Sequence, residues 1–283
     1  MLVKLRLNTF VLITTFFGFL IATLSGEEGW GWPRLLLLFH TLLGTAAAAF
    51  GASVFNQLME IKEDARMRRT ADRPLPAQRV LPMPAFILGF LLAGFGVIHL
   101  AAMVDRGAAL LAAITIATYV FFYTPLKRRS SANTLVGAIP GAIPPLIGWV
   151  GGGGGMEDPR GGFLFALLFL WQLPHFVSIN WLCREQYEEA GFRMWSDGDE
   201  SGRRSGYLAG MFSLALGAMA LVGPLAGYTG WSFGALGLAA GLLLAWLAAR
   251  FASSGERPAF RRFFLLTLLY LPVVLTVLAI DWK

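Results

Sequence analysis

Three oxygen-bearing side chains recur at a regular spacing near the end of the second apolar stretch. Asn56, Glu60 and Asp64 stand at positions i, i+4 and i+8, so on a helix they lie on one face. Neighbouring carboxylates repel each other unless a cation lies between them. Hard oxygen ligands suit Mg²⁺, which keeps waters and shares the phosphates of a substrate. The spacing indicates a magnesium site, and the alternative is a solvated acidic turn that ends a membrane helix.

A cluster of arginines follows this acidic face within nine residues of Asp64. Guanidinium groups bind phosphate oxygens through two parallel hydrogen bonds, so a metal on one side and arginines on the other suit a diphosphate. Contact with anionic lipid is the alternative, and it explains less well why acids and arginines are interleaved. The cluster comprises Arg66, Arg68, Arg69 and Arg73, after which Pro74 stops the helix.

The composition identifies the kind of protein that holds these residues. The chain has 283 residues, of which 56% are hydrophobic and only 14% are charged, and its mean hydropathy is +0.62. Soluble domains carry roughly 25% charged residues, so a soluble enzyme is excluded. The single cysteine, Cys183, excludes an intrachain disulfide and a cysteine-rich metal site. The net charge of +6 is better explained by membrane topology than by nucleic acid, which we do not expect as a partner.

Apolar stretches long enough to cross a bilayer recur nine times along the chain. Backbone groups in lipid must be hydrogen-bonded within the segment, so each stretch is predicted to be a helix. The sequence therefore predicts an all-α polytopic membrane protein with a single domain over residues 1–283. The expected spans are 9–25, 34–55, 83–104, 107–123, 133–150, 162–182, 207–228, 231–250 and 260–280.

The distribution of basic residues predicts the orientation of these spans. With the N-terminus inside, 19 of the 23 lysines and arginines fall in inside segments. This follows the positive-inside rule and predicts that the N-terminus, the acidic face and the arginines lie at the cytoplasmic side. We expect the membrane to be an inner cell membrane of bacterial type. The first span is predicted to be retained, the alternative being a cleaved signal peptide. The outer glycine run Gly151–Gly155 lacks the lysine of a phosphate-binding loop and is predicted to be a flexible linker.

Further polar residues lie at the ends of the fourth and sixth spans. Tyr123 precedes the basic residues Lys127 and Arg128, and from the residues alone this is an interfacial aromatic followed by a basic cluster that fixes the topology. His175 follows Pro174 within the sixth span, and ionisable residues inside a membrane are functional by default. It is either a functional residue, such as a ligand or a base, or a satisfied core histidine. Arg184 and Glu185, at the inner end of this span, are either site residues or a surface ion pair.

The order and spacing of these motifs resemble the UbiA-type intramembrane prenyltransferases. Within that superfamily they are most similar to the protoheme IX farnesyltransferase (haem O synthase) branch. The resemblance covers nearly the whole chain, and nine helices is the number typical of the family. The matching stretches are Asn56-x3-Glu60-x3-Asp64 with Arg69 and Arg73, Tyr123–Arg128, Asn133–Gly137, Gly141–Trp149, Trp171–Phe176, Arg184–Tyr187 and Ala190–Phe192.

The resemblance implies the transfer of a farnesyl group from farnesyl diphosphate to a vinyl group of protoheme IX, with addition of water. It implies Mg²⁺ as cofactor, a lipid bilayer around the protein, and a haem A synthase-type membrane protein as a partner. The implied catalytic residues are Asn56, Glu60, Asp64, Arg69, Arg73 and Lys127. The implied metal ligands are Asn56, Glu60, Asp64 and Glu185, and the implied binding residues are Tyr123, Arg128, His175, Arg184 and Tyr187.

The chain departs from the family pattern at four positions, which are Glu60, Lys62, Gln186 and Arg193. Glu60 stands where the family usually has aspartate, which keeps the charge on a longer side chain. Gln186 stands where a carboxylate is expected beside Glu185, which puts a second metal site in doubt. Three alternatives stay open: a sister enzyme for an aromatic, quinone-precursor or chlorin acceptor, a transporter, and a non-catalytic descendant. A transporter predicts charges near the bilayer midplane, whereas here they gather at one rim.

Overall fold

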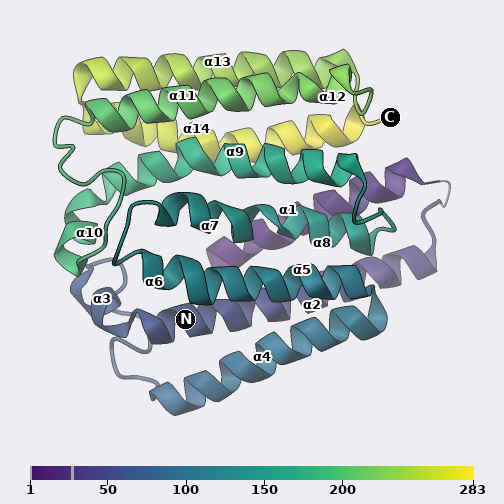
Figure 1. The fold of residues 1–283 in the computed structure, drawn as a ribbon, viewed down its shortest axis with the longest axis horizontal. Coiled ribbons are helices and arrows are strands. Elements are labelled where there is room, and N and C mark those ends of the chain that lie inside the picture. Colours follow the sequence, from purple (N-terminus) through teal and green to yellow (C-terminus); the bar gives the residue numbers. More distant parts are fainter. Residues whose placement is uncertain (1, 27–28) are drawn as a thin grey trace. The chain divides into compact units, whose positions relative to one another are not determined.

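The computed structural model describes residues 2–26 and 29–283, and their regular structure is helical, as predicted (Figure 1). Within this part of the chain the only strand-like pairing is an isolated bridge between Thr229 and Trp282. The elements are α1 (Leu5–Ser25), α2 (Trp32–Met59), α3 (Ile61–Arg66), α4 (Pro82–Met103), α5 (Arg106–Ala117), η1 (Thr118–Tyr123), α6 (Thr124–Leu126), α7 (Asn133–Ala142), α8 (Pro144–Gly151), α9 (Pro159–Leu182), α10 (Arg184–Ala190), α11 (Arg203–Ala220), α12 (Val222–Leu225), α13 (Trp231–Ser254) and α14 (Arg257–Ile280).

The described residues contain nine segments that are long and apolar enough to cross a bilayer. Their number and order are those predicted, with ends that shift by a few residues, so the polytopic all-α fold class is confirmed. The segments are Leu7–Ser25, Trp32–Met59, Pro82–Met103, Arg106–Leu126, Asn133–Gly151, Pro159–Leu182, Arg203–Leu225, Trp231–Ser254 and Arg257–Ile280.

The chain divides into two compact units, which we describe separately. The first comprises Met1–Gly161 with Gln186–Arg193, and the second comprises Gly162–Glu185 with Met194–Lys283. A single domain over residues 1–283 stays a prediction.

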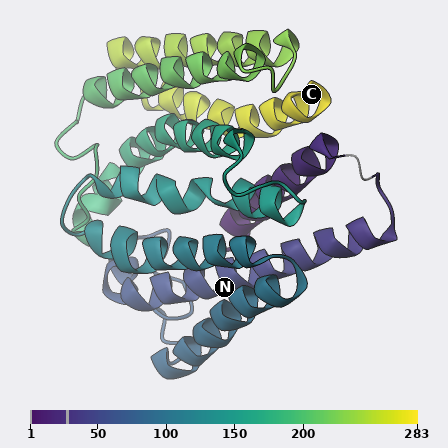
Figure 2. The same ribbon diagram turned by 45° about the vertical axis from the view of Figure 1, so that its right-hand side comes forward.

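In the first unit, helices α2 and α4 lie side by side and approach closely (Figures 1 and 2). A Cβ atom at Gly51 would lie 2.6 Å from the backbone nitrogen of Ala93, so only glycine fits there. Nearer the other end of the pair, His40 Nδ1 lies 3.1 Å from His99 Nε2. One neutral imidazole donates and the other accepts. Small residues and a polar contact of this kind are what join helices in lipid.

Helices α1 and α8, also in the first unit, meet even more closely. A Cβ atom at Gly148 would lie 1.9 Å from the carbonyl oxygen of Thr15, and one at Gly18 would lie 2.0 Å from that of Pro145. The two glycines thus allow the two backbones to touch. Because α1 begins at Leu5, this contact also fixes where the start of the chain, with Lys4, reaches the rest of the unit.

The glycine run at Gly151–Gly155 differs from its prediction. A Cβ atom at Gly152 would lie 2.7 Å from the carbonyl oxygen of Phe19, and one at Gly154 would lie 2.3 Å from the Trp149 ring. Gly152 and Gly154 are therefore closely packed after α8, which contradicts the prediction of a flexible linker at these two positions. Glycine is needed here because neighbouring groups occupy the space of a side chain.

The second unit is organised around the C-terminal end of α9. Trp181 packs edge-on against Phe251 of α13 and Phe260 of α14, with ring centroids 4.8 and 5.6 Å apart. Its indole nitrogen donates to the carbonyl oxygen of Asp199 at 2.8 Å. Helices α11 and α13 lie side by side in both views (Figures 1 and 2). These contacts hold the helix that carries His175.

We predict that Gly148→Ala destabilises the protein, because the added methyl group meets the Thr15 carbonyl. Overpacking of this kind costs about 1–3 kcal/mol or more, and we expect a lower melting temperature in detergent. Gly94→Ala in α4 is the matched control, because a Cβ atom there meets nothing within 4 Å. Equal melting temperatures for the two variants would contradict the close contact between α1 and α8.

Candidate active site

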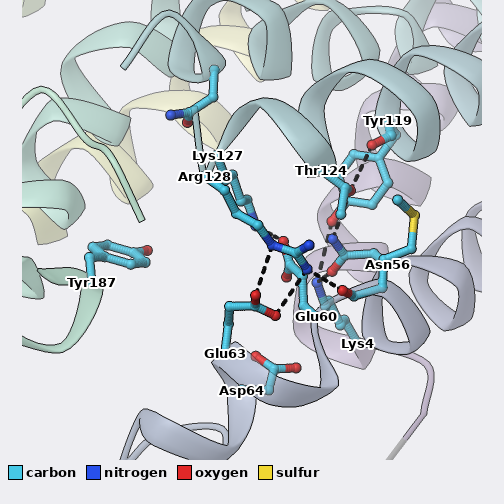
Figure 3. A network of polar contacts seen from close by, with 12 residues as sticks. Lys4, Asn56, Glu60, Glu63, Asp64, Tyr119, Thr124, Lys127, Arg128 and Tyr187 are labelled. Atoms are coloured by element: carbon cyan, nitrogen blue, oxygen red, sulfur yellow. Dashed lines mark hydrogen bonds and ion pairs between the residues drawn. The ribbon is translucent and has the colours of Figure 1, made fainter. Parts of the chain in front are cut away.

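Three segments of the first unit meet around Asn56, Glu60 and Asp64, a set that we call the oxygen row (Figure 3). They are the end of α2 with α3, the segment η1 with α6, and the residues before α1. The residues of the oxygen row are almost fully buried, with exposed fractions of 0, 2 and 1% for the whole residues. Buried carboxylates require counter-charges or hydrogen bonds, so the partners of the row define the site.

The helix that carries the oxygen row is not continuous, contrary to the prediction. Helix α2 ends at Met59 and α3 begins at Ile61, with Glu60 between them at φ −109° and ψ 17°. The backbone N–H of Glu60 still donates to Asn56 at 3.1 Å, and that of Asp64 donates to Glu60 at 2.7 Å. The hydrogen-bond register therefore passes through the break, and the three side chains stay together as the spacing predicted.

A widened helical turn brings the facing residues to the row. Pro125 has no N–H, and in a regular helix its ring would clash with the carbonyl four residues earlier. The chain before it adopts the π-helical segment η1, in which the N–H of Thr124 reaches the carbonyl of Tyr119. Insertions of this kind are frequent at functional sites. This turn places Tyr123 next to Lys127, whose ammonium lies 4.7 Å from the ring centroid.

The orientation of the Asn56 amide follows from its neighbours. The Thr124 hydroxyl donates to the Tyr119 carbonyl at 2.8 Å, so its oxygen is left to accept. It accepts from Asn56 Nδ2 at 2.9 Å, which turns Oδ1 the other way. Asn56 Oδ1 accepts a hydrogen bond from the Lys4 ammonium. Thr124 thus aims the amide oxygen of Asn56 at a positive charge.

A buried ion pair joins α6 to the oxygen row. Lys127 Nζ lies 2.8 Å from Glu60 Oε1, with exposed fractions of 11 and 3% for the two side chains. Burial alone would raise the pKa of Glu60, but the ammonium groups of Lys127 and Lys4 outweigh it and lower that pKa. Burial would likewise lower the pKa of Lys127, and the Glu60 carboxylate reverses this and raises it. Both groups are therefore charged at neutral pH.

Arg73 and Asp64 form a second ion pair within the site. Arg73 Nη1 donates to Asp64 Oδ2 at 2.7 Å. The other carboxylate oxygen, Asp64 Oδ1, is buried and accepts no hydrogen bond from any described residue. An orphaned carboxylate oxygen fits a cation, because leaving it unpaired costs free energy.

The donor set decides which cation fits this orphaned oxygen. Among the described residues, His, Cys, Asp and Glu side chains form no group of three that could hold a metal. A cation here would rely on the Asn56 amide, on waters and on substrate oxygens. That is the usual coordination of Mg²⁺.

Lys4 is a site residue that we read only as a topological charge. Besides Asn56 Oδ1, its ammonium reaches Tyr119 Oη at 3.3 Å (Figure 3). Burial lowers the pKa of Lys4 to about 7, against the attraction of Glu60. Lys4 is thus only partly protonated near neutral pH, whereas Lys127 keeps its charge.

The segment Gln186–Arg193 returns to the first unit and contacts the arginine cluster. Arg69 Nη2 donates to the Tyr187 hydroxyl at 2.6 Å, and its guanidinium lies 4.7 Å from the Tyr187 ring centroid. Gln186 Oε1 accepts from the backbone N–H of Arg69 at 3.4 Å. The ring of Phe192 lies 5.4 Å from the Lys127 ammonium. Two residues predicted from distant motifs, Arg69 and Tyr187, are therefore in direct contact.

Arg128 lies at the edge of this arrangement. Its guanidinium pairs with Glu63, at 2.8 Å from Nε to Oε1 and 3.0 Å from Nη2 to Oε2. It also donates to the Met59 carbonyl at the end of α2. These bonds tie α6 to α3. The contribution of Arg128 to the site is therefore to hold two of its walls together in this structure.

Three predicted residues belong to the second unit. Glu185 is 62% exposed and pairs with Arg184 at 3.2 Å and with Arg257 at 3.6 Å. His175 lies in α9, where its Nδ1 is 2.9 Å from the Thr267 hydroxyl oxygen. A role for Glu185 as a metal ligand, and for Arg184 and His175 in binding, stays a prediction.

Sequence reasoning missed Lys4, Tyr119, Thr124 and Glu63 as members of this site. Lys4 stands before the first span, where a basic residue is expected for topology alone. Thr124 lies inside the Tyr123–Arg128 motif, and its position before a proline was the signal that could have pointed to it. The approach of the chain start to the oxygen row has no sequence signal, because it depends on how α1 packs.

Comparison with protein families identifies the group to which this architecture belongs. The model of the UbiA prenyltransferase family matches residues 11–269. The chain belongs to the UbiA prenyltransferase family. The match spans both compact units and confirms the resemblance predicted from the motifs, together with the assignment of the chain as a prenyltransferase.

Curated relatives match this UbiA prenyltransferase over nearly its whole length. A protein from Opitutus terrae named protoheme IX farnesyltransferase is 40% identical over 281 residues, which are 99% of this chain and 92% of that protein. The mitochondrial protoheme IX farnesyltransferase of Homo sapiens is 34% identical over 276 residues. The aligned residues are 97% of this chain and 60% of the human protein.

Solved structures share the fold at much lower identity. A digeranylgeranylglyceryl phosphate synthase superposes with a TM-score of 0.77 at 15% identity and covers 98% of each chain. A UbiA homologue from Archaeoglobus fulgidus, bound to GPP and Mg²⁺, gives 0.65 at 14% identity, over 96% of this chain and 97% of that one. These likenesses confirm the helical fold.

We predict that Lys127→Met destabilises the protein strongly. The variant leaves the Glu60 carboxylate buried without its closest counter-charge, and breaking a buried pair in this way costs about 3–5 kcal/mol. Thermal unfolding in detergent measures the loss. The double variant Lys127→Met, Glu60→Gln is expected to recover most of it, since no buried carboxylate then lacks a partner. A single variant that melts with the wild type would show that the pair does not hold α6 in place.

Proposed function

We propose that this protein transfers the farnesyl group of farnesyl diphosphate to a vinyl group of protoheme IX and adds water, giving haem O and diphosphate. The observation that carries the proposal is the buried oxygen row facing Lys4, Arg73 and Lys127. Two buried carboxylates face three basic groups, and a bound Mg²⁺ would add two positive charges, so that the site would suit an anion with several charges. The names of the relatives support protoheme IX as the acceptor.

Mg²⁺ is the proposed cofactor, and Asn56, Glu60 and Asp64 would hold it. The support is the orphaned Asp64 Oδ1 and the Asn56 oxygen that Thr124 aims into the site. When bound, Mg²⁺ supplies Lewis-acid neutralisation of the diphosphate oxygens. The Mg²⁺ bound with GPP in the Archaeoglobus fulgidus homologue supports this assignment. Glu185 stays a proposed further ligand.

The basic residues receive the diphosphate. Lys127 offers a point charge, whereas Arg69 and Arg73 offer forked donors that match phosphate oxygens. Lys127 and Arg73 are held in place by Glu60 and Asp64, and Arg69 is held by Tyr187. Donors fixed before the reaction stabilise the charge that develops on the leaving group.

The chemical step breaks the C1–O bond of farnesyl diphosphate, and the bonding electrons leave with diphosphate. The π electrons of a haem vinyl group form a new bond to the allylic C1, which places a cation on the haem side chain. Water adds to this cation and releases one proton. The balance is farnesyl diphosphate, protoheme IX and water giving haem O, diphosphate and a proton. The Tyr123 ring, beside Lys127, is proposed to flank the allylic group.

Haem binding is proposed for His175 and Arg184, with Tyr187 and Arg128 at the edge of the diphosphate site. His175 offers an imidazole for the iron, and Arg184, whose guanidinium lies 4.4 Å from the Trp181 ring centroid, offers a cation for a propionate. Both substrates are amphiphilic, which suits a multi-pass membrane protein. We also propose the cytoplasmic side of a bacterial-type inner membrane for the site, supported by the basic-residue distribution, and a haem A synthase-type partner that consumes the product.

The test uses purified protein with protoheme IX, farnesyl diphosphate and Mg²⁺, and mass spectrometry detects haem that has gained a farnesyl group and water. Asp64→Ala is expected to abolish the product while the protein still inserts and folds. Asp72→Ala is the matched control, because Asp72 is 93% exposed and pairs only with Arg79 among its described ion pairs. In vesicles of defined sidedness, product is expected only when farnesyl diphosphate is supplied to the cytoplasmic side. Product from Asp64→Ala would remove the metal site, and a prenylated non-haem acceptor would favour a sister enzyme.

Arg69→Ala tests the proposal that Arg69 binds farnesyl diphosphate and does not bind haem. Loss of a charge-assisted hydrogen bond costs about 1.5–3 kcal/mol, so the KM for farnesyl diphosphate is expected to rise about tenfold or more, with a smaller change for haem. Arg68→Ala, at an exposed position of the same cluster, is the control. Equal losses for both substrates would count against a diphosphate role for Arg69.

A further inference from the structure

His175 is held tightly within the second unit. Its ring stacks between Trp171 and Phe264, with centroid distances of 5.4 and 4.9 Å and interplanar angles of 15 and 26°. Its Nδ1 lies 2.9 Å from the hydroxyl oxygen of Thr267 in α14. The ring is therefore fixed in plane and in position by three neighbours, and its hydrogen bond to Thr267 decides which nitrogen carries the proton.

The direction of that hydrogen bond follows from the other bond of Thr267. The Thr267 hydroxyl donates to the carbonyl oxygen of Phe264 at 2.6 Å. A hydroxyl has one hydrogen, so its oxygen can then only accept. His175 must be the donor, through Nδ1–H. In neutral imidazole one nitrogen carries the hydrogen and the other a lone pair, so Nε2 carries the lone pair.

The opposite tautomer satisfies fewer groups. With the hydrogen on Nε2, Thr267 would have to turn its hydroxyl toward Nδ1 and give up its bond to Phe264. The Nε2–H of His175 would then have no acceptor among the described residues. The opposite tautomer therefore makes one hydrogen bond at this position where the arrangement in the structure makes two. The arrangement in the structure is therefore the favoured one.

Thr267 is itself rigidly placed. It is fully buried, and its carbonyl oxygen accepts from the Trp171 indole nitrogen at 2.7 Å. Trp171 is also the ring that stacks on His175. One residue of α14 thus fixes both the proton on the imidazole and the aromatic wall beside it, and it does so without any charged group.

We propose that Thr267 is a positioning residue that holds His175 as the Nδ1–H tautomer, so that the Nε2 lone pair is presented to the iron of protoheme IX. This inference rests on the proposed function. A histidine that ligates a metal almost always donates its other N–H to a fixed acceptor, which sets the tautomer and raises the basicity of the ligand. Thr267 supplies that acceptor here.

The test titrates ferric protoheme IX into the purified full-length protein in detergent and follows the Soret band of the bound haem. His175→Ala is expected to lose the histidine-ligated spectrum. Thr267→Val keeps the shape of the side chain and removes the acceptor, so haem affinity is expected to fall about 10- to 100-fold, as for other partners of metal ligands. In turnover, its KM for haem rises and its KM for farnesyl diphosphate does not.

Two further variants separate positioning from packing. Thr267→Ser retains the hydroxyl and is expected to restore haem affinity to within about twofold of the wild type, since the acceptor of the His175 hydrogen bond is kept. Thr276→Val is the matched control, because Thr276 lies in the same helix and its hydroxyl donates to the Pro272 carbonyl oxygen at 2.7 Å. It is expected to bind haem as the wild type does. The melting temperature of each of the four variants is measured beside its haem affinity, so that a loss of affinity caused by unfolding is recognised.

The outcomes distinguish this inference from the proposed function. Wild-type affinity in Thr267→Val, or loss in Thr267→Ser equal to that in Thr267→Val, would overturn the positioning role. An unchanged haem spectrum in His175→Ala, with haem O still formed by the wild type, would overturn iron ligation and leave the transferase intact. If the wild type forms no haem O but binds haem through His175, the proposed reaction is overturned and ligation of the iron by His175 still holds. If the wild type neither forms haem O nor shows the histidine-ligated spectrum, the proposed reaction and the iron ligation are both overturned.

Discussion

The buried ion pair between Lys127 and Glu60 is the interaction on which the site depends. Neither charge would be tolerated alone at this depth, because the cost of burying an unpaired charge exceeds what nearby packing can offset. The pair therefore requires α6 and the end of α2 to arrive together. Pro125 makes this possible, since the widened turn before it lets the chain bring Lys127 round to the carboxylate. The widened turn thus positions the charge of Lys127, and the buried ion pair in turn stabilises the turn.

The same principle of fixed donors and acceptors recurs in both units. A threonine hydroxyl that donates its one hydrogen to a backbone carbonyl can only accept in its second hydrogen bond. Thr124 orients the Asn56 amide in this way, and Thr267 orients the His175 imidazole. Within a membrane such hydroxyls orient functional groups without adding a charge. In this protein the chemistry is thus prepared by neutral residues that lie beside the charged ones.

The glycine contacts explain how polar residues can lie close together within helices made for lipid. Gly51 and Gly148 let helix backbones touch, which fixes the positions of the helix ends that carry the basic and acidic side chains. The packing of α1 on α8 also places Lys4, which precedes α1, beside the oxygen row. A basic residue that serves topology in the sequence thereby becomes part of the site.

The sequence by itself determined the nine membrane-length segments found among the described residues, their order and the family, because hydrophobic length and motif spacing are local properties. It also placed Asn56, Glu60 and Asp64 on one face, which survives the break at Glu60 since the hydrogen-bond register passes through it. Only the tertiary structure decided the partners. The pairing of Arg69 with Tyr187, 118 positions apart, and the arrival of Lys4 beside Asn56 depend on helix packing, which no local pattern encodes.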